Sequence, residues 1–499
     1  MVINEKLCRA IIQGKKKLHF YRPAEQKIKI MNKHLITYIA LLTLAVLSSC
    51  KISKDIAVPQ LPLPANFRDA ANTDTAGIAT IPWKIFFTDA GLQNLIDSAI
   101  RNNYDMQVAL KNMEAAQLIV RQTKLGYLPE ARLQVGANLN RPSDNSLNGL
   151  SLGQFLGKSY VEDYSVTTAL SWEADIWGKI KNQKAKALAT YLQTTEARKA
   201  IQTNLVAFVA NGYYNLLMLD AQLAIANKNL LLNNSTLRII KLQYNAGQVT
   251  ALGVQQAEAQ RQVAVQLIPL LQQNITIQEN ALSILTAVLP AAIERNGSIG
   301  NIVFPENLSA GVPATLVSNR PDVKSYELAL NIANANTGIA KANMYPSLTI
   351  TAAGGINSFK ASNWFNIPAS LFGAVAGGIT QPLFQRRQLK TQYELAKVDR
   401  EKTVLQFRQS VLTAVGEVSD ALIKTAKIKE QEAIAGTRVN TLQQAISNAD
   451  LLFKNGMATY LEVITAQSNT LQGELELAAL KKDELNAVVE LYRALGGGQ

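Results

Sequence analysis

The residue types that most often carry catalysis are scarce in this chain. Its 499 residues contain two histidines, His19 and His34, and two cysteines, Cys8 and Cys50. Beyond residue 50 there is no histidine and no thiol, so the usual proton shuttle, cysteine nucleophile and soft metal site are unavailable there. The chain also has no glycine-rich phosphate loop and no nucleophile elbow. These features predict that the protein is not an enzyme and that it holds no metal and no cofactor.

The residues around Cys50 predict a covalent lipid in place of catalytic chemistry. A short basic start precedes an apolar stretch, Leu35 to Val46, that is too short to span a bilayer. Leu47-Ser48-Ser49-Cys50 then resembles the cleavage site of bacterial lipoproteins. We expect residues 1–49 to be removed and the Cys50 thiol to be acylated, which would anchor the mature N-terminus to a membrane. A chance cysteine after an ordinary signal is the alternative.

Much of the positive charge lies in the part expected to be removed. Residues 1–49 carry nine Lys and Arg against two Asp and Glu, so their removal lowers the formal net charge from +13 to +6. A moderate charge of this kind does not favour nucleic acid as a partner. Residues 1–30 lie upstream of Met31, so the sequence leaves open whether translation starts at Met1 or at Met31.

The two halves of the chain repeat one another. Tyr244-Asn245-Ala246-Gly247 in the first half matches Phe453-Lys454-Asn455-Gly456 in the second, at a constant offset of 209 residues. The match predicts an internal two-fold structural repeat, with a first repeat over residues 89–300 and a second over residues 301–499. Residues 50–88, whose first part contains Pro59, Pro62 and Pro64, are expected to form a lipid-anchored, extended linker.

Long proline-free segments in both halves predict long helices. No proline lies between Lys179 and Ile268 or after Pro382. A helix from Lys179 to about residue 244 would be about 100 Å long at about 1.5 Å per residue, which is far longer than a globular helix. Such helices must pack along their length, as in a tube with water on both sides. Further helices are expected at about 252–288, with a bend at Pro269, and at about 322–344, 389–452 and 460–495.

Four shorter segments alternate apolar and polar residues and predict β-strands. They lie at about 131–141, 163–174, 347–357 and 370–381. Segments of about ten residues with one apolar face are typical of membrane-spanning strands, and an amphipathic sheet of a soluble domain is an equal alternative. Four strands cannot close a barrel, whereas three copies would supply twelve. Membrane insertion and homotrimer formation are therefore one hypothesis.

The ends of these strands carry further signals. Trp172 and Trp364 lie near strand ends and are candidates for aromatic residues at the membrane interface. The connection between the first two strands contains one proline and three glycines and is expected to be a long polar loop: Pro142, Gly149, Gly153 and Gly157.

Two motifs of this sequence resemble those of a known family. Ser171-Trp172-Glu173-Ala174-Asp175-Ile176-Trp177-Gly178-Lys179 and Asn319-Arg320-Pro321-Asp322-Val323 look like segments of the TolC-like outer membrane factors, and Ala340 to Leu348 is similar to the family's entry into its third strand. The resemblance covers Asp89 to Gln499 and points to the lipidated branch that serves drug and metal efflux pumps.

The resemblance implies both a fold and a function. The fold would be α+β, a trimeric channel with a 12-strand transmembrane β-barrel, four strands per chain, continued by a 12-helix periplasmic α-barrel. The protein would be a passive exit duct in contact with outer membrane lipids. It would work with a periplasmic adaptor (membrane fusion protein) and an inner-membrane pump, of the proton-driven resistance-nodulation-division class.

The resemblance also suggests roles for residues at the repeated helix breaks. It places these breaks at the periplasmic tip, where the adaptor docks, although simple turn residues are the alternative. Glu462 stands where relatives have an acidic residue that rings the closed tip, and Thr465 stands where some have a second acid, so a solvated helix face is an equal alternative for this gate. The docking candidates are Gly247, Thr250, Leu252, Gly456, Thr459 and Leu461.

One feature of the sequence departs from the family pattern. Arg386 and Arg387 follow the fourth strand, where no glycine matches Gly178 of the first repeat.

Two other functions also fit parts of the sequence. The exit duct of a type I protein secretion system would share every feature except the lipid and the pump. A structural envelope lipoprotein without a pore would explain the lipid and the long helices, but not the four alternating segments.

Overall fold

The structure is a computed structural model that describes residues 67, 78–295, 297–302, 304, 311, 313 and 319–499. The predicted signal peptide, Met1, Met31 and the predicted lipidation site at Cys50 lie outside the described residues. The described residues all belong to one unit, Asp55–Gln499.

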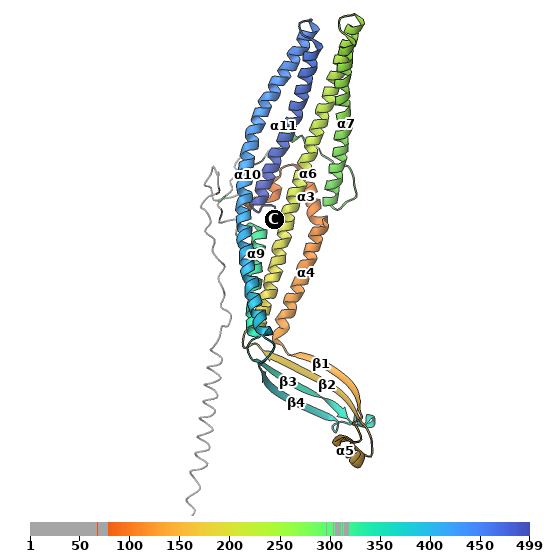
Figure 1. Ribbon diagram of the computed structural model, residues 1–499, viewed down its shortest axis with the longest axis vertical. Helices are drawn as coiled ribbons and strands as arrows, with labels where there is room; N and C mark the ends of the chain where they lie inside the picture. The colour runs from red at the N-terminus through yellow and green to blue at the C-terminus, as the bar shows by residue number, and fades with distance from the viewer. Residues whose placement is uncertain are drawn as a thin grey trace, which may run out of the picture. The chain divides into compact units, whose positions relative to one another are not determined.

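Four long helices form the main body of this unit (Figure 1). Helices α6 (Lys179–Asn245) and α10 (Gln388–Lys454) each contain 67 residues, and helices α7 (Ala251–Leu285) and α11 (Tyr460–Ala494) each contain 35. Each end of α10 and α11 lies 209 residues after the corresponding end of α6 and α7. The internal repeat predicted from one short motif is therefore confirmed at every end of these helices. Pro269 lies inside α7, which continues to Leu285.

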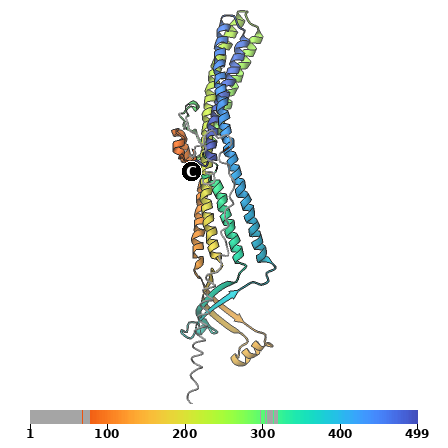
Figure 2. The ribbon, with the colours of Figure 1, turned by 90° about the vertical axis from the view of Figure 1, so that its left-hand side faces the viewer.

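Shorter helices pack alongside the long ones, as the view turned by 90° also shows (Figure 2). Helices α3 (Ala90–Asn102) and α4 (Tyr104–Lys124) pack against α6, and α9 (Pro321–Ala342) lies between α6 and α10. Asp89 caps α3 by accepting a hydrogen bond from the Leu92 backbone N–H at 2.8 Å. Among the described residues, no helix combines the length and the apolarity needed to cross a membrane.

The strands form one antiparallel sheet in the order β1-β2-β3-β4 (Figure 1). They are β1 (Glu130–Asn140), β2 (Val161–Ala174), β3 (Ser347–Ser358) and β4 (Leu371–Thr380), and their ends differ from the predicted ones by at most two residues. Because β2 of the first repeat pairs with β3 of the second, the repeats share one sheet and are not separate domains.

The register gives the sheet two chemically different faces. Residues opposite each other in neighbouring strands lie on the same face. The apolar face contains Leu133, Val135, Leu139, Val166, Leu170, Trp172, Leu348, Ile350, Ile356, Leu371, Val375 and Ile379. The polar face contains Arg132, Gln134, Asn138, Asn140, Asp163, Ser165, Thr167, Ser171, Thr349, Thr351, Asn357 and Thr380. Leu133 and Val375 of the apolar face are 71% and 81% exposed, so no part of the described chain covers the face at these positions.

The largest apolar core lies where α3, α6 and α11 meet, and it includes residues that precede Asp89. Phe86, at the end of α2 (Trp83–Phe86), stacks on the Tyr492 ring at 4.0 Å between centroids. The Tyr492 hydroxyl donates to the Ile81 carbonyl oxygen at 2.6 Å. The prediction of an extended linker over residues 50–88 is therefore wrong for residues 78–88, because their aromatic side chains are buried in the core.

A second correction concerns the connection between β1 and β2. The predicted polar loop contains the helix α5 (Leu147–Leu156). Ser146 caps it by accepting a hydrogen bond from the Gly149 backbone N–H at 3.1 Å, and Gly157 ends it in the left-handed conformation at φ 60°. The glycines interpreted as loop residues thus mark the first and last turns of a short helix.

Candidate functional site at the turns between the long helices

The two turns that join the long helices have the same backbone geometry. Gly247 and Gly456 are both left-handed, at φ 76° and 73°. In the first turn the Gln248 N–H donates to the Gln243 carbonyl oxygen at 2.8 Å, and in the second the Met457 N–H donates to the Leu452 carbonyl oxygen at 2.8 Å. This six-residue hydrogen bond with a left-handed glycine is the Schellman motif. The turn signal read from the sequence is confirmed in both repeats.

The helix starts that follow these turns differ in how they are capped. Thr250 precedes α7 without a side-chain cap, whereas Thr459 forms a complete capping box at the start of α11. In this box a Glu462 carboxylate oxygen accepts a hydrogen bond from the Thr459 backbone N–H. The predicted gate carboxylate is thus exposed but also fastens the first turn of its own helix. Thr465 is exposed one turn further along α11.

The two turns also contact each other through a residue that the sequence did not single out. The repeat places Gly253 of α7 where α11 has Glu462, and the Tyr460 ring packs on Gly253 so closely that an added Cβ would lie 3.0 Å from Cε1. The Tyr460 hydroxyl donates to Gln256 Oε1 at 2.8 Å. Glycine at position 253 therefore makes room for a contact between the two helix pairs. The missing acid in the first repeat was the only sequence signal for it.

The predicted docking residues all lie on the surface of these turns. Gly247, Thr250, Gly456 and Thr459 are exposed. Leu252 and Leu461, which are equivalent in the repeat, are 57% and 54% exposed. Beneath them a small apolar cluster joins all four long helices: Leu237, Ile240, Ala257, Phe453 and Val463. A rigid base with exposed leucines is a suitable geometry for contact with a helical partner.

The two candidate interface tryptophans lie at opposite ends of the sheet. Trp172, near the junction with the long helices, donates its indole N–H to the Tyr127 carbonyl oxygen at 2.9 Å. Trp364, in the connection between β3 and β4, packs on Tyr164 at 5.6 Å between ring centroids. Tyr164 and Trp172 are both on β2, about 26 Å apart along the strand at about 3.3 Å per residue. This spacing is similar to the apolar band of outer membrane barrels, about 25 Å.

The motif residues that carried the family resemblance have structural roles. Arg320 is 5% exposed and donates to Asp322 at 2.6 Å, to Glu417 at 2.8 Å and to the Ala494 carbonyl oxygen at 3.0 Å. It joins α9, α10 and α11. Trp177 stacks on Tyr345 at 4.9 Å between centroids and fixes the passage from sheet to helix.

Arg387 occupies the position where the first repeat has glycine. Gly178 precedes α6 at φ 73°, and Arg387 precedes α10 at φ 61°. Arg386 is also left-handed, at φ 47°. The same backbone turn is therefore made without glycine in the second repeat. Arg387 lies 3.8 Å from Glu394, an exposed ion pair of small energetic weight.

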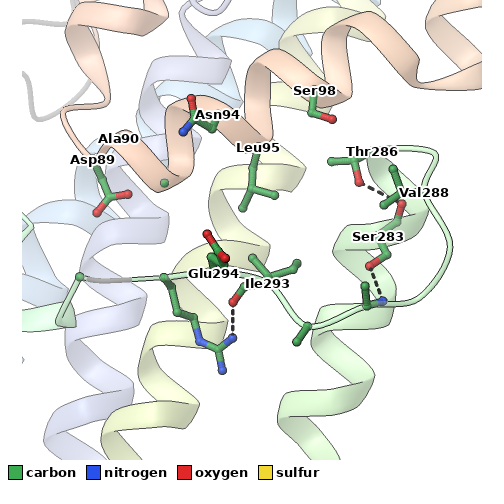
Figure 3. Close-up of a pocket in the computed structure, with 15 residues that line it drawn as sticks. Asp89, Ala90, Asn94, Leu95, Ser98, Ser283, Thr286, Val288, Ile293 and Glu294 are labelled. Carbon is green, nitrogen blue, oxygen red and sulfur yellow. Dashed lines mark hydrogen bonds between the residues drawn. The ribbon is translucent and has the colours of Figure 1, made fainter.

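A polar pocket of about 600 Å³ lies between the start of α3 and the segment after α7 (Figure 3). Two charged residues that line it, Asp89 and Arg295, form bonds between elements. The Tyr213 hydroxyl donates to Asp89 at 3.0 Å, and Arg295 bonds to Asp220 and Glu279. Burial, together with the bond to Asp89, raises the pKa of Tyr213. The pocket therefore marks a brace between α3, α6 and α7. Among the described residues, no group of three or more His, Cys, Asp and Glu is placed to hold a metal ion.

Comparisons with known proteins match this architecture along most of the chain. Over 473 residues the chain is 29% identical to the toluene efflux pump outer membrane protein TtgF of Pseudomonas putida, covering 92% of this chain and 96% of that protein. It is 27% identical over 464 residues to the cation efflux system protein CusC of Escherichia coli, covering 91% and 96%.

Solved structures show the same fold. A crystal structure of CusC, from a study of its folding and transmembrane channel formation, has a TM-score of 0.78 at 26% identity and covers 90% of this chain and 100% of that chain. The outer-membrane channel OprN has a TM-score of 0.82 at 21% identity, with coverage of 90% and 99%. The profile of one family, described as outer membrane efflux protein, matches residues 95–288 and 312–497. The chain belongs to the outer membrane efflux protein family.

Proposed function

We propose that three copies of this chain form a passive exit duct through the outer membrane, with no catalytic step of its own. The observation that carries this proposal is the sheet. Within the described residues, β1 and β4 each pair on one side only, and four strands with one apolar face cannot satisfy their backbone groups in lipid. Pairing of each β1 with the β4 of a neighbouring copy is antiparallel and closes a barrel of twelve strands.

The two faces of the sheet fit this assembly. In a closed barrel the apolar face, with Leu133 and Val375, would contact lipid, and the polar face, with Asn138 and Thr351, would line a water-filled lumen. A lumen of mixed polar side chains discriminates weakly between solutes. Relatives of similar identity are named for toluene and for cations. We therefore infer that the cargo is chosen by the pump and not by this duct.

Partners are expected at the end opposite the sheet. Helices α6 and α10, each about 100 Å long, carry the turns at their ends far from the membrane. We infer that a periplasmic adaptor contacts the exposed leucines Leu252 and Leu461 and connects the duct to an inner-membrane pump. An energy-converting pump is required because a passive duct cannot concentrate its cargo.

The N-terminal lipid is a separate proposal. We infer acylation at Cys50 from the preceding signal-like residues, and a chain changed by Cys50→Ser should lack the lipid and still assemble, since the barrel would hold it in the membrane. Mass spectrometry of the mature N-terminus measures this directly. An unmodified Cys50 in wild-type protein, or loss of membrane insertion in the variant, would contradict the proposal.

The two other functions fit less well. A structural envelope lipoprotein without a pore would not need a sheet with one apolar face, nor described edge strands that each pair on one side only. A duct for protein secretion remains compatible with the geometry, and the family and the named relatives favour efflux. Identifying the pump that co-purifies with the protein distinguishes these two ducts.

The oligomeric state tests the proposed assembly. The full chain, extracted from membranes in mild detergent, should have three times the mass of one mature protomer by native mass spectrometry. A monomer that is fully water-soluble after removal of the lipid would overturn the proposal.

A further inference from the structure

The helix α5, between β1 and β2, exposes apolar side chains at the end of the sheet farthest from the long helices. None of its ten residues is charged. Leu147, Leu150 and Phe155 are 84%, 55% and 85% exposed. An uncharged helix with such exposure is unusual for a surface in water and indicates a contact that is absent from a single chain.

Hydrogen bonds and a close backbone contact fix the start of α5, and a left-handed glycine ends it. The Ser146 hydroxyl both accepts from the Gly149 N–H and donates to the Ser143 carbonyl oxygen at 2.7 Å. Gly149 lies so close to Ser143 that an added Cβ would meet its carbonyl oxygen at 2.1 Å. Gly157 provides the left-handed end. The exposed side chains are therefore presented from a defined position.

The position of α5 identifies which side of the sheet it covers. A groove of about 550 Å³ lies between α5 and the sheet. The strand residues that line it are two cross-strand pairs, Asn138 with Asp163 and Asn140 with Val161. Asn138, Asn140 and Asp163 belong to the polar face, and Val161, the partner of Asn140, shares that side. The helix therefore lies on the side of the sheet that faces away from lipid in a closed barrel.

We propose that the α5 helices of three copies pack against one another across the outer mouth of the barrel. This inference rests on the proposed trimer, because only there does the polar face enclose a lumen. Three-fold symmetry brings the three uncharged helices toward one axis, where Leu147, Leu150 and Phe155 of each copy can cover those of the others. A lipid surface would instead require α5 on the apolar face.

The proposed contact gives the channel a second closure, at the end opposite the helix turns. A ring of leucine and phenylalanine side chains around a narrow opening favours dewetting, which blocks ions and polar solutes until the ring is spread. Apolar or bulky cargo would displace such a ring without breaking any hydrogen bond.

Cysteine cross-linking in the full-length, membrane-extracted trimer tests this inference. We expect Leu147→Cys to form disulfide-linked dimers on mild oxidation with diamide, seen on a non-reducing gel and reversed by a reducing agent. The matched control is Leu133→Cys, an equally apolar leucine on β1 that is 71% exposed on the apolar face. Three copies of Leu133 would point outward, so this control should not cross-link.

The outcomes separate the two proposals. Trimers in which Leu147→Cys does not cross-link would overturn the inference and leave the duct intact. Cross-linking of both variants would also overturn it, because the contact would then not be specific to the lumen side. Absence of trimers would overturn the proposed function and this inference together.

Discussion

At the residue scale, Glu462 combines two roles that a single substitution can separate. Its carboxylate closes the capping box with Thr459, and three copies would bring three negative charges to the end of the tube. Glutamine at this position of a capping box also accepts the backbone hydrogen bond. We therefore expect Glu462→Gln to leave the stability of α11 nearly unchanged while lowering the cation preference and the block by divalent ions. Reversal potentials in a salt gradient measure this, and unchanged selectivity would remove Glu462 from the gate.

The glycine and arginine at equivalent helix starts form a matched pair. An added Cβ at Gly178 would make only an ordinary contact, with Asn182 Nδ2 at 3.8 Å, but the backbone there is left-handed. Gly178→Ala should therefore lower the free energy of unfolding by about 1 kcal/mol through backbone strain. Arg387 already bears that strain, so Arg387→Gly should be neutral or stabilising by less than about 1 kcal/mol. Chemical denaturation followed by circular dichroism measures the free energy of unfolding of both variants and of the wild type. If both substitutions changed the free energy of unfolding by the same amount and in the same direction, the left-handed backbone would not be the cause of the change.

At the element scale, α10 and α11 carry a pair of glutamates that makes their packing sensitive to pH. Burial, and then the hydrogen bond with Glu432, raise the pKa of Glu484 from 4.5 to about 7, against the opposing effect of Lys429 and Lys481. The folded chain therefore binds this proton more tightly than the unfolded chain does. Its stabilising contribution is complete below about pH 4.5 and is lost as the pH rises through about 7.

The neutral variant Glu484→Gln should abolish this dependence. We expect it to unfold at a higher temperature than wild type above about pH 7 and at nearly the same temperature below about pH 4.5. Glu432→Gln is the control, because it removes the partner carboxylate and should bring the pKa of Glu484 back down. A wild-type unfolding temperature that does not change between these pH values would contradict the assignment.

Most elements of this fold could be predicted from local sequence patterns, and the exceptions have physical reasons. The long helices follow from the distribution of proline and the 209-residue repeat, and the strands follow from period-two alternation. Helix α5 was missed because its glycines at positions 149, 153 and 157 are typical of loops. The buried start of the core at Phe86 was missed because its partner Tyr492 lies at the other end of the chain.

The candidate site was predictable in its turns but not in its contacts. Left-handed glycines at 247 and 456 follow from the sequence alone, since few other residues adopt that conformation readily. The packing of Tyr460 on Gly253 joins two repeats that are distant in sequence, so no local pattern could reveal it. A side chain at position 253 would place its Cβ 3.0 Å from that ring, which is tighter than ordinary packing, so space accounts for the missing acid there.

At the scale of the whole molecule, the protein is an outer membrane component of an efflux pump, and the α+β fold inferred from its sequence is confirmed. One chain supplies four strands and two pairs of long helices, and within the described part of the chain the edge strands β1 and β4 each pair on one side only. Assembly and membrane insertion should therefore occur together, since an isolated sheet would leave backbone groups unpaired in lipid.

The most direct test of the duct is the electrical conductance of the purified full-length protein in a planar lipid bilayer. The proposed closed barrel predicts discrete current steps that scale linearly with voltage in a variant in which both proposed closures are opened. Tyr460→Ala opens the helix turns by removing the contact with Gly253 and Gln256, and Phe155→Ser weakens the apolar ring of α5. Correctly folded trimers that insert into the bilayer and stay silent with this variant would contradict it.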